Sequence, residues 1–377
     1  MMIAAAPTSI ALFAGTNSHG PTDRVCRLEN CAGFERLYGG LSPGSHLGYA
    51  VLHFFENGGT QARVLRIESR GDDATGAAPH DEDFRRQLLD AFAPGGLVDS
   101  GGAFNLLCVP GLTHAPTVLA LQRACHERRA FLLVDCAEND TVASVTARLA
   151  DLAGPYAMSA ALYFPWVRAG DLLGQGALRA FPPSGFVAGV MARIDARRGV
   201  WKAPAGVEAF IKGSAGASRV LSDVQHGLLN PLGINCLRDF HPHGTVIWGA
   251  RTLHGGDSRG SEWKYIPVRR LALFLEESLY RGTDWVRFEP NGEPVWAKIR
   301  ADVGDFMLSL WRQGAFQGRS PAEAFLVRCD RSTMTQDDLD SGRVNVVVGF
   351  APLKPAEFVI LQIQQLAATT HGPGSAA

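Results

Sequence analysis

The sequence predicts an α/β region followed by a smaller α+β region. Between residues 71 and 235, short apolar segments alternate with longer segments whose apolar residues recur at helical spacing. This alternation is typical of a mostly parallel sheet with helices on its faces. After residue 235, two amphipathic helices lie between strand-like segments, which indicates an α+β domain. A length of 377 residues suffices for two or three domains.

The first 70 residues are predicted to contain two strands and a helix. The apolar residues 10–15 predict a buried strand, and residues 64–67 predict a second one. Between them, apolar residues at helical spacing predict a helix over 47–55. It should end at Gly58, because glycine readily adopts the left-handed conformation that closes a helix. Residues 70–80, rich in Gly, Asp and Ala, predict a boundary loop.

The middle region supplies most of the predicted α/β layer. Pro116 lies where a proline fits a helix best, in its first turn. The predicted strands are residues 106–109, 131–136 and 158–164, and the predicted helices are residues 116–128, 141–152 and 186–198. Strands this apolar need helices on both faces of their sheet.

The region after residue 235 is predicted to combine two helices with two strands. The helices are residues 268–279 and 299–310, and the strands are residues 244–253 and 343–349. Val344, Val346 and Val348 share one face of the second strand, because side chains alternate along a strand. The final residues 367–377 are small and predict a flexible tail.

Composition narrows the function classes. Lys and Arg number 36 against 37 Asp and Glu, so the net charge of -1 predicts no general attraction to nucleic acid or anionic lipid. The seven cysteines show no C-x-x-C spacing and lie in apolar contexts, which predicts buried, reduced thiols. The apolar start lacks a basic segment, and no uncharged run approaches the ~20 residues of a membrane span. We therefore expect synthesis and folding in the cytoplasm.

A serine hydrolase is one enzyme class to weigh. Asp135 ends an apolar strand, and Ser214 and Ser218 follow in a Gly-rich segment. A triad in the order Asp, His, Ser needs a histidine between them, and none is present. The G-x-S-x-G motif is absent as well, so we predict no catalytic residues.

A metal site is the other chemistry to weigh. His241, His243 and His254 lie close in sequence, and alternate histidines on a strand would share one face. Pro242 between the first two and Gly244 after them predict a turn instead. No phosphate-binding P-loop occurs either, so we predict no metal and no cofactor.

Ordered motifs from one end of the chain to the other resemble those of phage tail sheath proteins. They begin with Pro-Thr-Ser-Ile-Ala-Leu-Phe-Ala-Gly at residues 7–15. The later ones are Phe-Phe-Glu-Asn-Gly-Gly at 54–59, Leu-Asn-Pro-Leu-Gly-Ile-Asn at 229–235, Gly-Thr-Val-Ile-Trp-Gly-Ala-Arg-Thr-Leu at 244–253, Tyr-Ile-Pro-Val-Arg-Arg at 265–270, Glu-Pro-Asn at 289–291 and Phe-Ala-Pro-Leu-Lys-Pro-Ala-Glu-Phe at 350–358. Several motifs in the family's order are more specific than any one of them.

The resemblance implies a domain plan. Residues 1–70 would be an N-terminal sheath segment, 71–235 a subtilisin-like α/β domain without the triad, 236–366 a C-terminal sheath domain, and 367–377 a flexible tail. Family members usually carry an arm before the Pro-Thr-Ser strand, whereas only Met1 to Ala6 precede Pro7 here. The expected N-terminal arm is therefore short or missing.

The resemblance also implies how copies would join. In the family, strands from neighbouring subunits add to a third subunit's sheet, which is β-augmentation used for polymerisation. The strands that we assign to this role are marked by Val344, Val346, Val348, Phe358, Val359, Ile360, Leu361 and Ile363. The alternative is that they form an ordinary internal strand pair.

The implied function is that of a structural subunit of a contractile tail sheath, as in phage tails, R-type pyocins and extracellular injection systems. Its partners would be further copies of itself, an inner tube protein, and baseplate and cap proteins, without nucleic acid or membrane insertion. It would assemble in the bacterial cytoplasm and remain in the tail or tail-like particle. The alternatives are a cap or baseplate adaptor with the sheath fold, or a hydrolase using Asp135 with Ser214 or Ser218.

Overall fold

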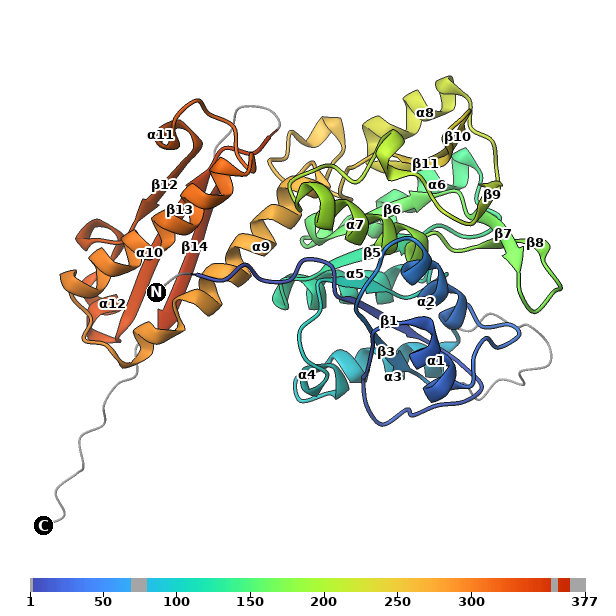
Figure 1. Ribbon diagram of the computed structural model, residues 1–377, viewed down its shortest axis with the longest axis horizontal. Coiled ribbons are helices and arrows are strands. Elements are labelled where there is room, and N and C mark those ends of the chain that lie inside the picture. Colours follow the sequence, from blue (N-terminus) through green and yellow to red (C-terminus); the bar gives the residue numbers. More distant parts are fainter. Residues whose placement is uncertain (1–2, 69–79, 354–358, 367–377) are drawn as a thin grey trace, which may run out of the picture. The chain divides into compact units, whose positions relative to one another are not determined.

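The computed structural model describes residues 3–68 and 80–353, and the backbone of residues 359–366. The chain divides into two compact units (Figure 1). Residues 7–270 form one, which we call the α/β unit. Residues 1–6 and 271–377 form the other, the C-terminal unit. The division falls within one helix, α9 (Ile266–Gly282).

An eight-stranded sheet is the centre of the α/β unit, with the strand order β11-β10-β6-β5-β4-β1-β3-β2. Its strands are β1 (Ala11–Gly15), β2 (Cys26–Leu28), β3 (Ala62–Arg66), β4 (Leu106–Cys108), β5 (Phe131–Asp135), β6 (Ala160–Phe164), β10 (Ile234–Phe240) and β11 (Gly244–Trp248). The six strands from β10 to β3 pair in parallel, and β2 and β11 add antiparallel edges. The predicted parallel sheet covered by helices is thereby confirmed.

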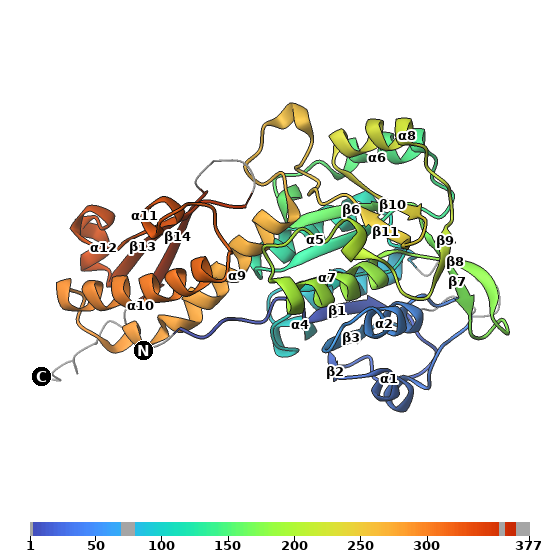
Figure 2. The same cartoon turned by 45° about the horizontal axis from the view of Figure 1, so that its top comes forward.

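Helices cover both faces of this sheet (Figure 2). The α-helices of the unit are α1 (Cys31–Tyr38), α2 (Leu47–Glu56), α3 (Glu82–Phe92), α4 (Leu97–Ser100), α5 (Ala115–Glu127), α6 (Val142–Leu152), α7 (Ser184–Arg198) and α8 (Asp223–Leu229). Single 3-10 turns are η1 (Ala157–Ser159), η2 (Val207–Ala209), η3 (Asn230–Leu232) and η4 (Asp257–Arg259). A second, antiparallel sheet has the order β8 (Ala177–Phe181), β7 (Val167–Asp171), β9 (Ser214–Ala217).

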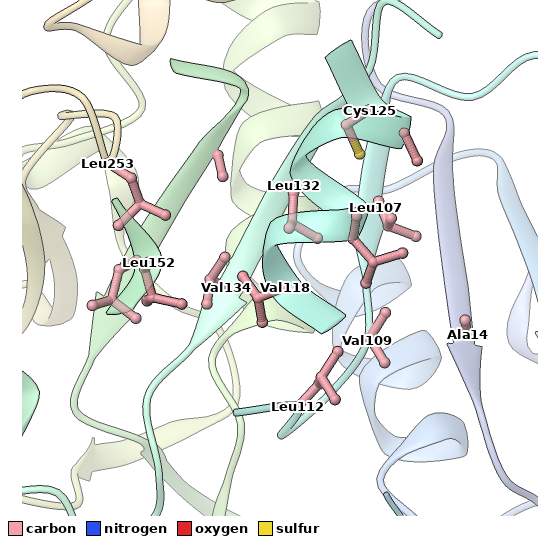
Figure 3. Close-up of a cluster of buried hydrophobic side chains, with 14 of the residues drawn as sticks. Ala14, Leu107, Val109, Leu112, Val118, Cys125, Leu132, Val134, Leu152 and Leu253 are labelled. Atoms are coloured by element: carbon pink, nitrogen blue, oxygen red, sulfur yellow. The ribbon is translucent and has the colours of Figure 1, made fainter. Parts of the chain in front are cut away.

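The main core lies between the sheet and α5. Val118 and Cys125 of α5 lie against Leu107 of β4 and Leu132 and Val134 of β5 (Figure 3). The intervening residues of these strands are buried on the opposite face, so β5 is buried along its whole length. Burial on both faces explains why these strands read as continuous apolar runs.

The opposite face carries α7, which packs closely on α2. A Cβ added at Gly189 of α7 would lie 2.5 Å from the backbone oxygen of Phe54, and one at Gly185 would lie 2.6 Å from that of Ala50. Glycine at these two positions therefore lets the helix backbones approach. Nearly all of α7 is buried, although its sequence has no strong amphipathic pattern.

The C-terminal unit is built on a three-stranded antiparallel sheet with the order β12-β13-β14. Its elements are the end of α9, η5 (Asp284–Phe288), α10 (Glu293–Arg312), α11 (Pro321–Ala324), β12 (Phe325–Arg328), η6 (Arg331–Thr333), α12 (Gln336–Asp340), β13 (Arg343–Phe350) and β14 (Val359–Leu366). Helix α10 packs against the sheet (Figure 1). Residues 3–6 also belong here: Ile3 and Ala6 are buried, and the Ala6 N–H donates to Ser278 Oγ on α9 at 2.9 Å.

Two sequence expectations differ from the structure. The strand expected over 244–253 ends at Trp248. The domain boundary expected at residue 235 is also not where the compact units divide, because β10 and β11 pair with each other and join β6 of the large sheet. The backbone pairing of β10 therefore places these residues in the α/β unit, and the division comes after residue 270.

Candidate functional site

The strand predicted to link subunits, β13, is the central strand of its sheet. It pairs with β12 on one side and with β14 on the other, so both of its backbone edges are used within the chain. Val344, Val346 and Val348 are at most 2% exposed. Within the single chain these three valines form the core of the C-terminal unit, and their assignment to an inter-subunit strand stays a prediction.

The two edges of this sheet are β12, with four residues, and β14, with eight. The longer edge strand is β14. Among the described residues it pairs with β13 alone, in a continuous antiparallel register over eight residue pairs. Val359, Ile360, Leu361 and Ile363 all belong to this strand, and Phe358 lies outside the described residues. Of the predicted linking residues, those of β14 are the ones with backbone available to another chain.

Loop side chains hold the sheet in place near the start of β13. Asn291, from the Glu-Pro-Asn motif, donates through Nδ2 to the backbone oxygen of Arg343 at 3.0 Å. Its Oδ1 accepts from Trp296 Nε1 at 2.8 Å. This motif residue thereby connects the beginning of α10 to the beginning of β13.

A second set of bonds holds the middle of β13. Asn345 Nδ2 donates to Asp338 Oδ2 at 3.0 Å and to the backbone oxygen of Thr333 at 3.1 Å. The backbone N–H and the hydroxyl of Thr335 also donate to Asp338, and these bonds hold the pKa of that carboxyl below its ordinary value. The hydrogen bonds of Asn291 and those of Asn345 therefore both hold β13 from within the same chain.

Asp135 lies at the carboxyl end of β5, as expected, but its partner is not a predicted serine. Its carboxylate accepts from Ser184 N, Ser184 Oγ and Gly111 N at 2.8 to 2.9 Å. Asp135 and Ser184 are fully or almost fully buried, and burial raises the pKa of Asp135 to about 6. The carboxylate thus fixes the beginning of α7, a role that sequence reasoning missed because 49 residues separate the pair.

The predicted serines lie in other surroundings. Ser214, on β9, shares a hydrogen bond of 2.7 Å with Thr245 Oγ1, which donates to Asp239 at 2.6 Å. Ser218 is exposed, and its N–H donates to the backbone oxygen of Trp166. The constellation required by the hydrolase alternative is therefore not assembled.

The three histidines considered as metal ligands lie in different surroundings. His241 and His243 are exposed in the turn between β10 and β11, as Pro242 predicts. His254 shares a hydrogen bond of 2.7 Å with Ser261 Oγ. Within residues 3–68 and 80–353, no three His, Cys, Asp or Glu side chains are grouped so that they would hold a metal ion. In the same part of the chain, no helix is both long and apolar enough to cross a membrane.

Comparisons with known proteins agree on one family. Residues 90–253 match the model of the phage tail sheath protein central domain, and residues 258–365 match that of the phage tail sheath C-terminal domain. Together these matches cover well over half of the chain. Both place residues 236–253 outside the C-terminal domain, which agrees with the strand pairing of β10 and β11.

Individual relatives point the same way. A putative prophage major tail sheath protein of Pseudomonas aeruginosa (strain UCBPP-PA14) is 28% identical over 188 residues, which are 48% of this chain and 45% of that protein. The chain thus aligns with about half the length of this curated relative.

Two solved structures match over almost the entire chain. The PVC sheath complex of an extracellular contractile injection system, in its contracted state, contains a chain with a TM-score of 0.77 and 29% identity, covering 97% of this chain and 93% of that one. The baseplate of the anti-feeding prophage contains one with a TM-score of 0.76 and 28% identity, covering 97% and 95%.

Proposed function

Because this chain belongs to the family of phage tail sheath proteins, we propose that it is a structural subunit of a contractile sheath. Many copies would surround an inner tube and contract to drive that tube through a target envelope. The proposal assigns the chain a structural rather than a catalytic role. Its partners are further copies, an inner tube protein, and the baseplate and cap at the two ends. Assembly would take place in the bacterial cytoplasm, and the α/β unit would be the family's subtilisin-like domain.

The free edge of β14 carries the proposal. An unpaired strand edge is a template for a strand from another chain, and natural proteins usually block it with charges, prolines or a bulge. The segment Val-Ile-Leu-Gln-Ile-Gln-Gln-Leu at 359–366 contains no charged residue and no proline, and its register with β13 is unbroken. We infer that a strand from a neighbouring copy adds to this edge. A contact that joins two different surfaces and does not close produces an open helical assembly.

The test removes β14 while keeping β13. A chain that ends at Pro352 lacks β14, whereas a chain that ends at Leu366 lacks the tail alone and is the matched control. Full-length protein and the control should form tubes or stacked rings in negative-stain images, with or without the inner tube protein. The chain ending at Pro352 should stay dispersed.

A pair of proline variants guards against simple misfolding. Neighbouring residues of a strand direct their N–H groups to opposite sides, so either Gln362→Pro or Ile363→Pro removes an outward N–H without breaking the pairing to β13. The proline variant that removes the outward N–H should keep a folded C-terminal unit and should no longer assemble. Tubes from the chain ending at Pro352 would contradict the role of β14. Full-length protein that never assembles would contradict the sheath function, and a single closed ring would identify a cap or baseplate adaptor.

A further inference from the structure

The outward surface around α8 carries four large apolar side chains. Val220, Val224, Leu228 and Leu232 have exposed fractions of 82%, 74%, 60% and 43%. Val224 and Leu228 are four residues apart on α8, Leu232 lies in η3, and Val220 lies just before the helix. Residues four apart lie on the same side of a helix, so Val224 and Leu228 share the outward side of α8, and Val220 and Leu232 lie near its two ends. We call these four residues the α8 row.

The opposite side of α8 is already buried. Leu221 and Leu229 are at most 5% exposed and belong to the core of the α/β unit. A helix at a protein surface normally has polar residues on its outward side, whereas the exposed part of α8 carries Val224 and Leu228 beside Asp223. Exposed apolar surface of this extent typically marks a contact with another molecule.

Helix α6 lies beside α8 and extends the same surface (Figure 2). Its exposed residues include Ala143, Ala147 and Ala150, which are small and apolar. We call the surface formed by these alanines and the four large side chains of the α8 row the α6–α8 face. The exposed charged residues of these two helices are Asp151 and Asp223.

A second exposed apolar cluster lies on the hairpin of β7 and β8. Leu172, Leu173 and Leu178 are 63%, 49% and 53% exposed. The hairpin projects from the α/β unit in Figure 1. Elsewhere in the described part of this unit, the large apolar side chains with comparable exposure are Leu37 and Val207, each by itself. Exposed apolar surface in the α/β unit therefore gathers at two separate places.

The charges beside the two clusters are complementary. On the hairpin, Arg179 is paired with Asp171 at 3.6 Å, and Arg168 is exposed. On the α6–α8 face, Asp151 is exposed at the end of α6, and Asp223 is exposed on α8, where it is paired with Arg238 at 2.7 Å. Arg219 lies just before Val220 in the chain. A hairpin that lies on this face with Arg168 toward α6 would place opposite charges together.

We propose that the β7–β8 hairpin of one copy docks on the α6–α8 face of the next copy. An open assembly requires contacts between two different surfaces, and these two are the exposed clusters of large apolar side chains in the described part of the α/β unit. The proposal rests on the sheath function, because it needs many copies of the chain. It adds a side-chain contact between α/β units to the strand contact made by the C-terminal unit.

The test is disulfide formation between two single-cysteine variants. Leu173→Cys reports on the hairpin and Val224→Cys on the face, both in a Cys31→Ser background because the other native cysteines are buried. The two variants carry tags of different length, are mixed under assembly conditions and are oxidised. The mixed dimer should exceed each self-dimer by about tenfold, since a docked pair has a raised effective concentration. Leu37→Cys, exposed but outside both clusters, should pair with neither.

The outcomes separate this inference from the sheath function. A missing mixed dimer overturns the docking, as does a Val224→Cys self-dimer of equal yield, which would indicate a symmetric contact. Images of the same samples decide the function independently. Tubes without the mixed dimer keep the sheath function and reject the docking. Dispersed particles that still give the mixed dimer keep the docking and reject the sheath function.

Discussion

The sheets of the two units differ in how much strand backbone they leave unpaired at their edges. In the α/β unit, helices cover both faces of a wide sheet, and strands such as β1 and β5 are buried along their whole length. In the C-terminal unit, three strands leave one long strand, β14, at the edge. The large sheet also has two edges, β2 and β11, but these strands have three and five residues, whereas β14 offers an edge of eight residues to a further strand. The comparison indicates that the C-terminal unit provides backbone-mediated assembly.

The units also differ in their ionisable groups. Every histidine within residues 3–68 and 80–353 lies in the α/β unit. Burial lowers the pKa of His46 to about 4, helped by Arg179, and the pKa of His53 to about 3, helped by His46. Burial also lowers the pKa of His80 to about 4, helped by the nearby His46 and Arg85. Acid should therefore weaken the α/β unit by a route that the described C-terminal unit lacks.

The largest effect is expected from a buried charge in β13, which tests whether the two units unfold separately. Val348→Asp should destabilise the C-terminal unit by roughly 4 kcal/mol or more, because an unpaired carboxylate has no partner in an apolar core. The α/β unit should keep its own transition. Urea unfolding and limited proteolysis measure the two units separately. Val220→Asp, at an 82% exposed position, should change stability by less than about 0.5 kcal/mol. Loss of both transitions together would show that the units do not fold independently.

The next largest effect concerns a buried ion pair in the α/β unit. Arg270 Nη2 lies 2.6 Å from Asp195 Oδ2, and these side chains are 3% and 4% exposed. Arg270→Ala leaves a buried carboxylate without a cation, with the Thr8 hydroxyl still donating to it at 2.7 Å, so the α/β unit should lose roughly 3–5 kcal/mol. The control is Arg281→Ala on the same helix, which breaks a partly exposed pair with Glu277 and should cost under about 1 kcal/mol. Equal losses from the two variants would contradict this account.

The smallest effect appears as a pH dependence. The pKa of His53 is lower in the folded than in the unfolded chain, so the unfolded chain binds the proton first and stability falls as the pH drops below about 6.5. Between pH 7 and pH 5 this group should remove roughly 2 kcal/mol from the free energy of unfolding. His53→Phe, which keeps the ring stacked on Phe186, should lose that part of the pH dependence.

The comparison of wild type with His53→Phe contains its own control, because the other titrating groups are the same in both proteins. Asp135 has a raised pKa, so it adds stability as the pH falls through about 6, and His46 and His80 act against it. All three groups are present in both proteins and cancel in the comparison. Identical slopes for wild type and His53→Phe would show that His53 does not titrate differently in the two states.

Much of the α/β unit was predictable because its signals are local. The expected strands and helices over residues 106–198 match β4, α5, β5, α6, β6 and α7 to within about four residues. The hairpin of β7 and β8 was missed, since its residues are half exposed and lack a continuous apolar run. Helix α8 was missed as well, because seven residues with mixed polar and apolar side chains give little periodicity.

The sequence by itself determined most of the strands and helices over residues 106–198 and which side chains share one face of β13, because these follow from spacing within a few residues. Its ordered motifs also showed the resemblance to a family. Tertiary structure alone decided that β13 is central and β14 is the edge, that β10 joins the larger sheet, and that Asp135 bonds Ser184 rather than Ser214. The physical reason is that alternation along a strand sets the direction of its side chains, whereas its backbone partner is selected by contacts between distant residues.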